Sequence, residues 1–297
     1  MNMVMPSKMN GDKMKETTMK KKLYFTMLLA GLVFAGCSSD DAPEQNPVEP
    51  AKTYYMSVDA SKDFNDAASR LNRALTLTYN TLTDKNSLTP SWAVGEKVYV
   101  YAHTAYPKFW FEGYLEAKSA GTTTQLNGAL SLPGSMDKST LSSLTEFTLV
   151  FPRPSQPGYL DYTGQIGTLE DIAAKYDYAM AENVEFTIVE GNHIVAIADN
   201  VIFKSQQAIV KFTLKDKADE GATLLNATSL EVSVGSDTYT ITPASATSEI
   251  YVAIPGFDDL TLTLTATVGS DTYQFSKTLV TFENGKYYEI GVKMTKQ

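Results

Sequence analysis

The second half of the chain alternates short apolar-patterned segments with turn residues, and this pattern restricts the fold more than any other feature. In residues 261–268, Leu262 and Leu264 alternate with Thr263 and Thr265, so the leucines share one face of an extended strand. Six more segments alternate or are continuously apolar: 208–214, 229–234, 238–242, 249–254, 272–277 and 286–294. Seven short strands separated by turns predict a β-sandwich in this half.

The first half carries similar strand signals together with two short helical segments. Strands are expected at 54–58, 74–82, 98–101, 108–115, 122–132, 147–151, 184–189 and 193–198. Apolar residues three and four apart predict an amphipathic helix over 61–75, and Thr168 is placed to cap a short helix over 168–174. We therefore expect an all-β chain with a few short helices, divided into an N-terminal domain over 54–200 and a C-terminal domain over 201–297.

A signal for export lies near the start of the chain. Three lysines at 20–22 precede an apolar run over 23–35 and small residues that lead to Cys37, the only cysteine. This order is typical of a secretory signal, and the apolar run is shorter than the about 20 residues that span a bilayer. We expect residues 1–36 to be the signal peptide, with Met19 as an alternative start. The competing interpretation is a transmembrane anchor with an incidental cysteine.

The end of this signal resembles a bacterial lipobox. The segment Phe34-Ala35-Gly36-Cys37 has the small residues and the cysteine of that motif, although leucine is usual where Phe34 stands. The resemblance implies cleavage between Gly36 and Cys37, and lipid such as palmitate on the thiol and the new amino group of Cys37, which together anchor firmly. Residues 37–53 then contain three prolines, several acids and almost no large apolar residue, which predicts a disordered, solvated tether.

Charge excludes one class of partner. The net charge is −9, from 25 basic and 34 acidic residues, and part of the basic set lies in the expected signal peptide. Nucleic-acid binding requires a basic face that neutralises phosphates. We therefore expect no nucleic-acid partner.

The sequence contains no recognisable catalytic or metal-binding constellation. His103 and His193 are the only histidines, and Cys37 is assigned to lipid, so few transition-metal ligands remain. No nucleophile elbow, phosphate loop or dinucleotide glycine pattern is present. Glu112 and Glu116 could pair for glycoside hydrolysis, but carboxylates on an acidic chain are more often solvated. The prediction is a protein that is not an enzyme, with no catalytic residue, cofactor or metal.

A cluster of aromatic residues at 106–114 allows two interpretations. Tyr106, Phe109, Trp110, Phe111 and Tyr114 would be mostly core in a sandwich, since alternate side chains of a strand point inward. Those that point outward could stack on sugars or on a partner protein. Trp110, Tyr106 and Tyr114 are the candidates for exposed aromatic residues.

Several motifs in order along the chain resemble one known family. They are W-x-x-G-E at Trp92–Glu96, F-T-L-V-F-P at 147–152, Q-I-G at 165–167, Y-V-A-I-P at 251–255 and N-G-K-Y-Y at 284–288. With the lipobox and the tether, they resemble the fimbrillin family of Bacteroidetes surface proteins over nearly the whole mature chain. The resemblance implies two tandem transthyretin-like Greek-key β-sandwiches in a stalk, tip or anchor subunit of a pilus at the outer membrane and cell surface. The implied partners are other pilin subunits, with a host or glycan ligand as a further option.

The resemblance also implies a maturation step. In polymerising members an arginine-specific protease removes the first strand, and a strand of the next subunit fills the groove by β-augmentation. Here Tyr54–Val58 would be the removed strand and cleavage would follow Arg70 or Arg73. Arg73 is preferred because it directly precedes an alternating strand. The C-terminal segment 286–297 is a candidate donor or closing strand. A stable helix over 61–75 would hinder cleavage and indicate an uncleaved anchor.

Two rival classes remain beside a pilus subunit. A surface glycan-binding lipoprotein that stays lipid-anchored would also need an anchor and a β-sandwich, and exposed coplanar aromatics around Trp110 would favour it. A lipoprotein hydrolase is less consistent with the missing catalytic constellation.

Overall fold

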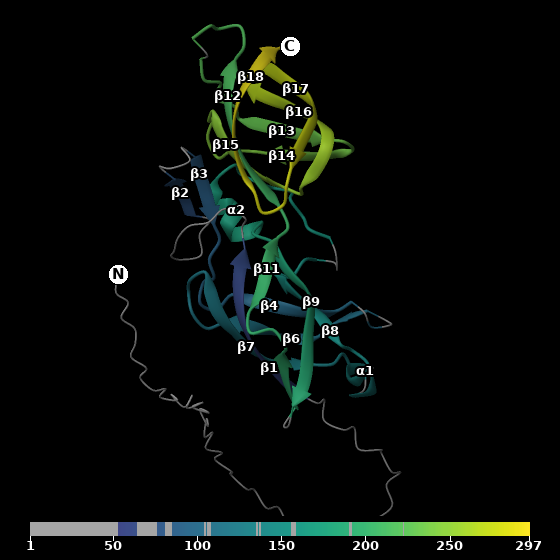
Figure 1. Ribbon diagram of the computed structural model, residues 1–297. Helices are drawn as coiled ribbons and strands as arrows, with labels where there is room; N and C mark the ends of the chain where they lie inside the picture. Colours follow the sequence, from purple (N-terminus) through teal and green to yellow (C-terminus); the bar gives the residue numbers. More distant parts are fainter. Residues whose placement is uncertain are drawn as a thin grey trace, which may run out of the picture. The chain divides into compact units, whose positions relative to one another are not determined.

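The computed structural model is almost entirely β (Figure 1). It describes residues 53–63, 76–80, 85–103, 105, 108–134, 136, 138–155, 159–189, 192–221 and 223–297. Residues 1–52, including Gly36 and Cys37, lie outside the described residues, as do Arg70, Arg73 and Tyr106. Thr53, expected as the last residue of the tether, instead begins the first strand. Among the described residues, no helix has the length and apolar character needed to cross a membrane.

The N-terminal sandwich is a nine-stranded sheet that closes on itself. Its strands run in the order β10-β1-β11-β9-β8-β4-β6-β7, β5 pairs with β4, and β1 also pairs with β7. The strands are β1 (Thr53–Asp63), β4 (Lys97–Ala102), β5 (Phe109–Trp110), β6 (Glu112–Ala117), β7 (Thr123–Ser131), β8 (Glu146–Phe151), β9 (Ala179–Val189), β10 (His193–Ala196) and β11 (Val201–Ser205). A separate hairpin consists of β2 (Thr76–Asn80) and β3 (Lys85–Thr89). The helices are α1 (Lys138–Ser142) and α2 (Leu169–Lys175).

The C-terminal sandwich contains seven strands in the order β14-β13-β16-β17-β18-β12-β15. They are β12 (Ala208–Asp216), β13 (Ser229–Val234), β14 (Asp237–Ile241), β15 (Glu249–Ile254), β16 (Phe257–Val268), β17 (Asp271–Phe282) and β18 (Tyr287–Lys296). β12 pairs antiparallel with β15 and parallel with β18. β18 meets β17 at only two positions, so the sheet divides naturally into two layers.

The two sandwiches repeat one Greek-key topology. In the second, the first strand β12 lies between the fourth strand β15 and the last strand β18. In the first, β1 has the same place: it is antiparallel to β7 and parallel to β10 and β11. The opposite layers also correspond, β6-β4-β8-β9 in one and β14-β13-β16-β17 in the other. This is the transthyretin-like arrangement that the family resemblance implies, so the predicted fold class is confirmed.

Each sandwich has its own hydrophobic core. The first is built around Trp92, Phe111, Phe147 and Phe203, all at most 1% exposed. The second consists largely of aliphatic residues of β12, β13, β15 and β16. The alternation of inward and outward side chains predicted for 261–268 is present on β16, where Leu262 and Leu264 are buried. Inward and outward positions alternate along a strand.

Two expectations about element boundaries were wrong. Val201 does not begin the second sandwich, since Val201–Ser205 form β11 and pair with β1 and β9 of the first; the second sheet starts at Ala208. The helix expected over 61–75 does not begin at Ser61, because Ser61–Asp63 continue β1 in register with β7 and β11. The rest of that segment lies outside the described residues. The short helix capped by Thr168 is confirmed, with the Thr168 hydroxyl accepting a hydrogen bond from the Asp171 N–H at 3.2 Å.

The Q-I-G motif fastens the loop before α2 to β15. The buried Gln165 side chain accepts a hydrogen bond from Ala253 N–H at 2.7 Å and donates one to Ala253 O at 2.8 Å. Gly167 has φ +77°, and a side chain there would come within 3.0 Å of Ile250. The motif residues at 165–167 and 251–255 are therefore parts of one contact, which the sequence alone showed only as separate motifs.

We predict that Gly128→Ala destabilises the N-terminal sandwich. A Cβ at Gly128 of β7 would lie 2.0 Å from Tyr114 O, a backbone atom of β6 that cannot move without disturbing the sheet. Overpacking of this kind costs about 1–3 kcal/mol or more of unfolding free energy. Urea denaturation measures the loss. Gly134→Ala is the matched control, since nothing lies within 4 Å of its Cβ position, and an equal loss in both variants would contradict the prediction.

Candidate functional site

β1 is held by strands on both of its edges. Its residues Thr53–Ser61 pair antiparallel with β7 in continuous register. On the other edge Tyr55–Ser57 pair parallel with β10, and Ala60–Asp63 pair parallel with β11. β1 is thus an interior strand, and main-chain hydrogen bonds to its neighbours are the chief directional contacts that hold it.

The inward face of β1 closes the N-terminal core. Tyr54, Met56, Val58 and Ala60 are at most 4% exposed, and the alternate residues between them face outward. The strand is 11 residues long, longer than the Tyr54–Val58 segment expected from the sequence. Removing it would open a long apolar groove between β7 and the β10–β11 pair.

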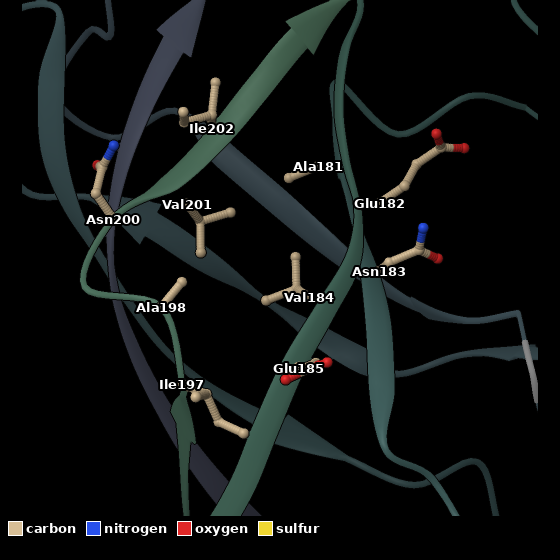
Figure 2. Close-up of a pocket in the computed structure, with 10 residues that line it drawn as sticks. All are labelled: Ala181, Glu182, Asn183, Val184, Glu185, Ile197, Ala198, Asn200, Val201 and Ile202. Carbon is tan, nitrogen blue, oxygen red and sulfur yellow. The ribbon is translucent and has the colours of Figure 1, made fainter.

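A pocket marks the place where one neighbour of β1 changes. β10 ends at Ala196 and β11 begins at Val201, and the break opens a pocket of about 420 Å³ (Figure 2). Val184 and Val201 face the space between β9 and β11, whereas Glu182 and Asn183 project from the far side of β9 (Figure 2). At Val58 and Asp59, between the two parallel ladders, β1 pairs with β7 alone.

The last inward position of β1 is a buried lysine. The Lys62 side chain is 1% exposed, and its Nζ lies 3.3 Å from Glu96 Oε2 and 3.0 Å from Asp177 Oδ2. The ammonium also donates to Ser91 O at 3.5 Å. A buried charge is tolerated only when it is paired and hydrogen-bonded, and here two carboxylates and a carbonyl supply those partners.

Aromatic rings complete this site, which we call the lysine pocket: Ser91, Trp92, Glu96, Phe151 and Asp177. Lys62 Nζ lies 4.5 Å from the centre of the Trp92 ring and 3.9 Å from that of Phe151. Desolvated cation–π contacts of this kind stabilise by up to about 2 kcal/mol. Trp92 is fixed in turn by edge contacts with Phe151 and Phe203, at 5.5 and 5.1 Å between ring centres.

Burial controls the ionisation of Glu96. Desolvation raises the pKa of the Glu96 carboxyl, and the Lys62 ammonium together with a hydrogen bond from Ala93 opposes that rise. Asp177 adds a smaller upward effect on the same pKa, because its negative charge is close. Lys62 therefore keeps Glu96 closer to ionisation than burial alone would allow.

Motifs that the sequence analysis singled out separately converge on the lysine pocket. W-x-x-G-E supplies Trp92, Glu96 and Gly95, whose φ of +84° suits glycine in the turn before β4. F-T-L-V-F-P supplies Phe151 at the end of β8. Reasoning from sequence missed Lys62, since residues 61–75 were assigned to a helix. The signal that could have found it was the period of two from Tyr54 to Lys62.

The four described residues of the aromatic cluster divide evenly between inward and outward positions. Phe109 and Phe111 are buried, Trp110 is half-buried and Tyr114 is 39% exposed. Trp110 is tilted 34° against Tyr101 at 4.8 Å between ring centres.

Each of the two outward rings, Trp110 and Tyr114, packs against a neighbouring ring at an angle and against a cation. Tyr99 meets Tyr114 at 60°, with 6.2 Å between ring centres. The Arg153 guanidinium lies 5.1 Å from the Trp110 ring centre, and Lys97 Nζ lies 4.2 Å from that of Tyr114.

Within the described part of the chain, no group of three or more His, Cys, Asp or Glu residues is placed to hold a metal ion. The structure brings together Lys62, Glu96 and Asp177. None of these three was predicted as a site residue from the sequence. Of the residues that were, Trp110 and Tyr114 are described above, and Gly36, Cys37, Arg70, Arg73 and Tyr106 lie outside the described residues.

Comparisons with solved structures give distant similarities. A candidate cell adhesion protein of Bacteroides uniformis matches 69% of this chain and 91% of its own, with 12% identity and a TM-score of 0.38. A fimbrial assembly protein of Parabacteroides distasonis matches 81% and 91%, with 11% identity and a TM-score of 0.35. The shaft pilin SpaA of Lactobacillus rhamnosus GG matches 83% and 98%, with 11% identity and a TM-score of 0.30.

No family model and no curated protein sequence matches the chain. The structural similarities are too distant to assign a function, so the function proposed below depends on the pairing of β1 and on the sequence motifs.

We predict that Lys62→Met lowers the unfolding free energy by about 3–5 kcal/mol at neutral pH, because it deprives two buried carboxylates of their cation. Lys97→Met is the control: Lys97 is an exposed lysine at the start of β4, and its loss should cost less than about 1 kcal/mol. Chemical denaturation of the two variants measures the difference. Equal losses would show that the ion pairs of Lys62 contribute little.

The loss caused by Lys62→Met should depend on pH. Without the ammonium, the pKa of Glu96 in the folded state rises further, so its ionisation opposes folding at pH values above the unfolded-state pKa. The deficit relative to the wild type should therefore narrow as the pH falls from about 7 toward about 5. Denaturation midpoints measured across this range test the sign, and a deficit that widens on acidification would contradict it.

Proposed function

We propose that this chain is a structural or accessory subunit of a cell-surface pilus, exported as a lipoprotein and assembled by donor-strand exchange after removal of an N-terminal strand. β1 is the strand removed, and the groove it leaves between β7 and the β10–β11 pair receives a strand from the next subunit. Such β-augmentation relies on main-chain hydrogen bonds for affinity and on alternate side-chain pockets for specificity.

The observation that carries this proposal is the position of β1 in the chain and in the sheet. β1 is interior in the sheet, with partners on both edges. Along the chain, Arg70 and Arg73 follow β1 and precede all the other strands of both sandwiches. Cleavage of one bond there would detach the whole of β1 from the covalent chain and would leave every other strand connected.

The arginine content favours these sites over others. The chain contains three arginines, Arg70, Arg73 and Arg153. Arg153 is followed by Pro154, a poor sequence for cleavage, and its guanidinium packs on the Trp110 and Tyr99 rings. An arginine-specific protease is therefore directed to the segment after β1, with Arg73 preferred over Arg70.

The leader sequence supports export and membrane anchoring of the protein. The lipobox-like end of residues 1–36 supports lipid attachment at Cys37, and the tether over 37–53 would hold the sandwiches away from the outer membrane. Cleavage after Arg73 separates the lipidated segment, which includes β1, from all the other strands of both sandwiches. The same step that opens the groove therefore also releases the subunit from the membrane. This role needs no catalytic residue, and none is proposed.

We predict that changing both Arg70 and Arg73 to Lys abolishes maturation. The substitution keeps the charge and removes the arginine that the protease requires. Wild-type protein isolated from its native cell surface should begin at Ala74, or at Leu71 if Arg70 is used, and should carry no lipid. The variant should retain an acylated Cys37 and should form no polymer. Mass spectrometry and N-terminal sequencing measure both states, and Arg153→Lys serves as the control that matures normally.

Polymers formed by protein that still retains β1 would overturn this mechanism. A wild-type subunit that begins at acylated Cys37 on the cell surface would instead indicate an anchor or a lipid-held surface protein.

A further inference from the structure

The lysine pocket is built by residues that remain when β1 is removed. Trp92 and Glu96 lie before β4, Phe151 ends β8 and Asp177 lies just before β9. Only the ammonium comes from β1. The opened groove would thus present two buried carboxylates and two aromatic rings in an arrangement that already fits a lysine, at the end of the groove where Lys62 sits.

A strand that fills the groove must satisfy that pocket or leave the two carboxylates without their cation. Uncompensated buried charge costs several kcal/mol, more than the variation among apolar side chains of similar size. The pocket is therefore the part of the groove that discriminates most strongly between sequences. The four positions before it, Tyr54, Met56, Val58 and Ala60, require only apolar side chains of suitable size.

β18 repeats the inward pattern of β1 with the same spacing. The inward residues of β1 are Tyr54, Met56, Val58, Ala60 and Lys62. Alternate residues of β18 are Tyr288, Ile290, Val292, Met294 and Lys296. Both series begin with tyrosine, continue with three apolar residues and end with lysine eight positions later. The largest difference is Met294 against Ala60, and methionine is the apolar side chain that adapts most readily to irregular space.

Other registers of β18 do not satisfy the pocket. A shift of two residues in one direction would put Met294 at the Lys62 position, and a shift of two in the other would put Lys296 at the buried Ala60 position. A shift of one residue turns Glu289 and Lys293 toward the core, because the side-chain period of a strand is two. The register with Lys296 in the pocket is the one in which all five inward positions match in character.

We infer that the lysine pocket recognises Lys296 of a second copy of this chain and thereby sets the register of the exchanged strand. This inference rests on the proposed donor-strand exchange with segment 286–297 as the donor, and it adds the residue that determines specificity and register. In the donated state, the Lys296 ammonium takes the position of the Lys62 ammonium between Glu96 and Asp177. The backbone of β18 then pairs with β7 on one edge and with β10 and β11 on the other.

Donation of β18 would exchange the contacts it makes in its own sandwich for those of the groove. It pairs parallel with β12 at eight positions, meets β17 at Tyr273–Lys296 and Gln274–Thr295, and buries Val292 and Met294 in the C-terminal core. Lys296 has an exposed side chain and binds Asp271 at 2.6 Å on the surface, an interaction worth about 1 kcal/mol at most. In the groove β18 gains pairing on a second edge, interrupted only between β10 and β11, and Lys296 moves from a solvated ion pair to a buried site that already fits an ammonium.

The test is assembly of the full chain after digestion with an arginine-specific endoprotease, followed by size-exclusion chromatography with light scattering. Wild type, Lys296→Met and Lys293→Met are compared. Lys293 is an exposed lysine on the same strand, facing the opposite way. We expect wild type and Lys293→Met to polymerise alike and Lys296→Met to polymerise at least about tenfold more slowly, since it leaves the pocket without a cation.

A neutral pocket provides a second measurement that a general defect in β18 would not change. The combined variant Lys62→Met, Glu96→Gln and Asp177→Asn removes all three charges of the cluster and keeps the side chains close to their original size. In that background, the protein with Lys296→Met should polymerise at least as fast as the protein that keeps Lys296. The coupling between Lys296 and the pocket follows from the four rates as a double-mutant cycle.

The outcomes separate the two proposals. If wild type polymerises with β1 lost and Lys296→Met matches Lys293→Met, the lysine-pocket inference is overturned and donor-strand exchange stands. An unchanged effect of Lys296→Met in the neutral pocket would also overturn the inference. If cleaved wild type loses β1 and still forms no polymer, donor-strand exchange itself is overturned.

Discussion

One buried ammonium links the first strand of this protein to the rest of its N-terminal core. Lys62 reaches Glu96 and Asp177 from the end of β1 and lies over the rings of Trp92 and Phe151. Taking these charges out of water is costly, and the cost is offset only while all of them are together. The arrangement therefore specifies which residue must lie at this position more than it adds to net stability.

The sheet topology shows why specificity at this position matters. β1 and β12 hold equivalent places in two sandwiches of the same Greek-key order, each between an antiparallel and a parallel neighbour. β1 and β12 differ in how the chain connects them to the other strands. β12 is preceded by a short connection from β11, whereas β1 is followed by a segment with two of the three arginines. In our proposal a cut in that segment converts an interior strand into an exchangeable one, and the lysine pocket then selects its replacement.

Much of the fold could be predicted from the sequence because strand alternation and turns are local signals. The all-β class, the two sandwiches and the capped helix after Thr168 followed from residue patterns and from the family resemblance. The predicted domain boundary at Val201 was wrong because the sequence of an apolar strand does not show which sheet the strand joins. β11 pairs with β1, which lies more than a hundred residues earlier. The prediction of a helix over 61–75 was wrong at its start because residues 61–63 fit both a helical and a strand periodicity. Pairing with β7 and β11 makes them part of a strand.

The site was harder to predict than the fold. Trp92, Glu96 and Phe151 stood in motifs, yet nothing local indicated that they surround one lysine. Lys62 resembles a solvated charge in sequence, and only the register of β1 turns it inward. Asp177 carried no sequence signal, since it precedes β9 without a motif of its own. Contacts of this kind are set by tertiary pairing, so they emerge only when the strands are in register.

The most direct measurement is a structure of the assembled polymer that identifies which residues lie between β7 and the β10–β11 pair. Our account predicts that residues 53–63 of the same chain are absent from that position. A strand of a neighbouring copy should lie there instead, with its Lys296 ammonium between Glu96 and Asp177. A polymer in which each subunit retains its own β1, with Lys62 in the pocket, would contradict the account.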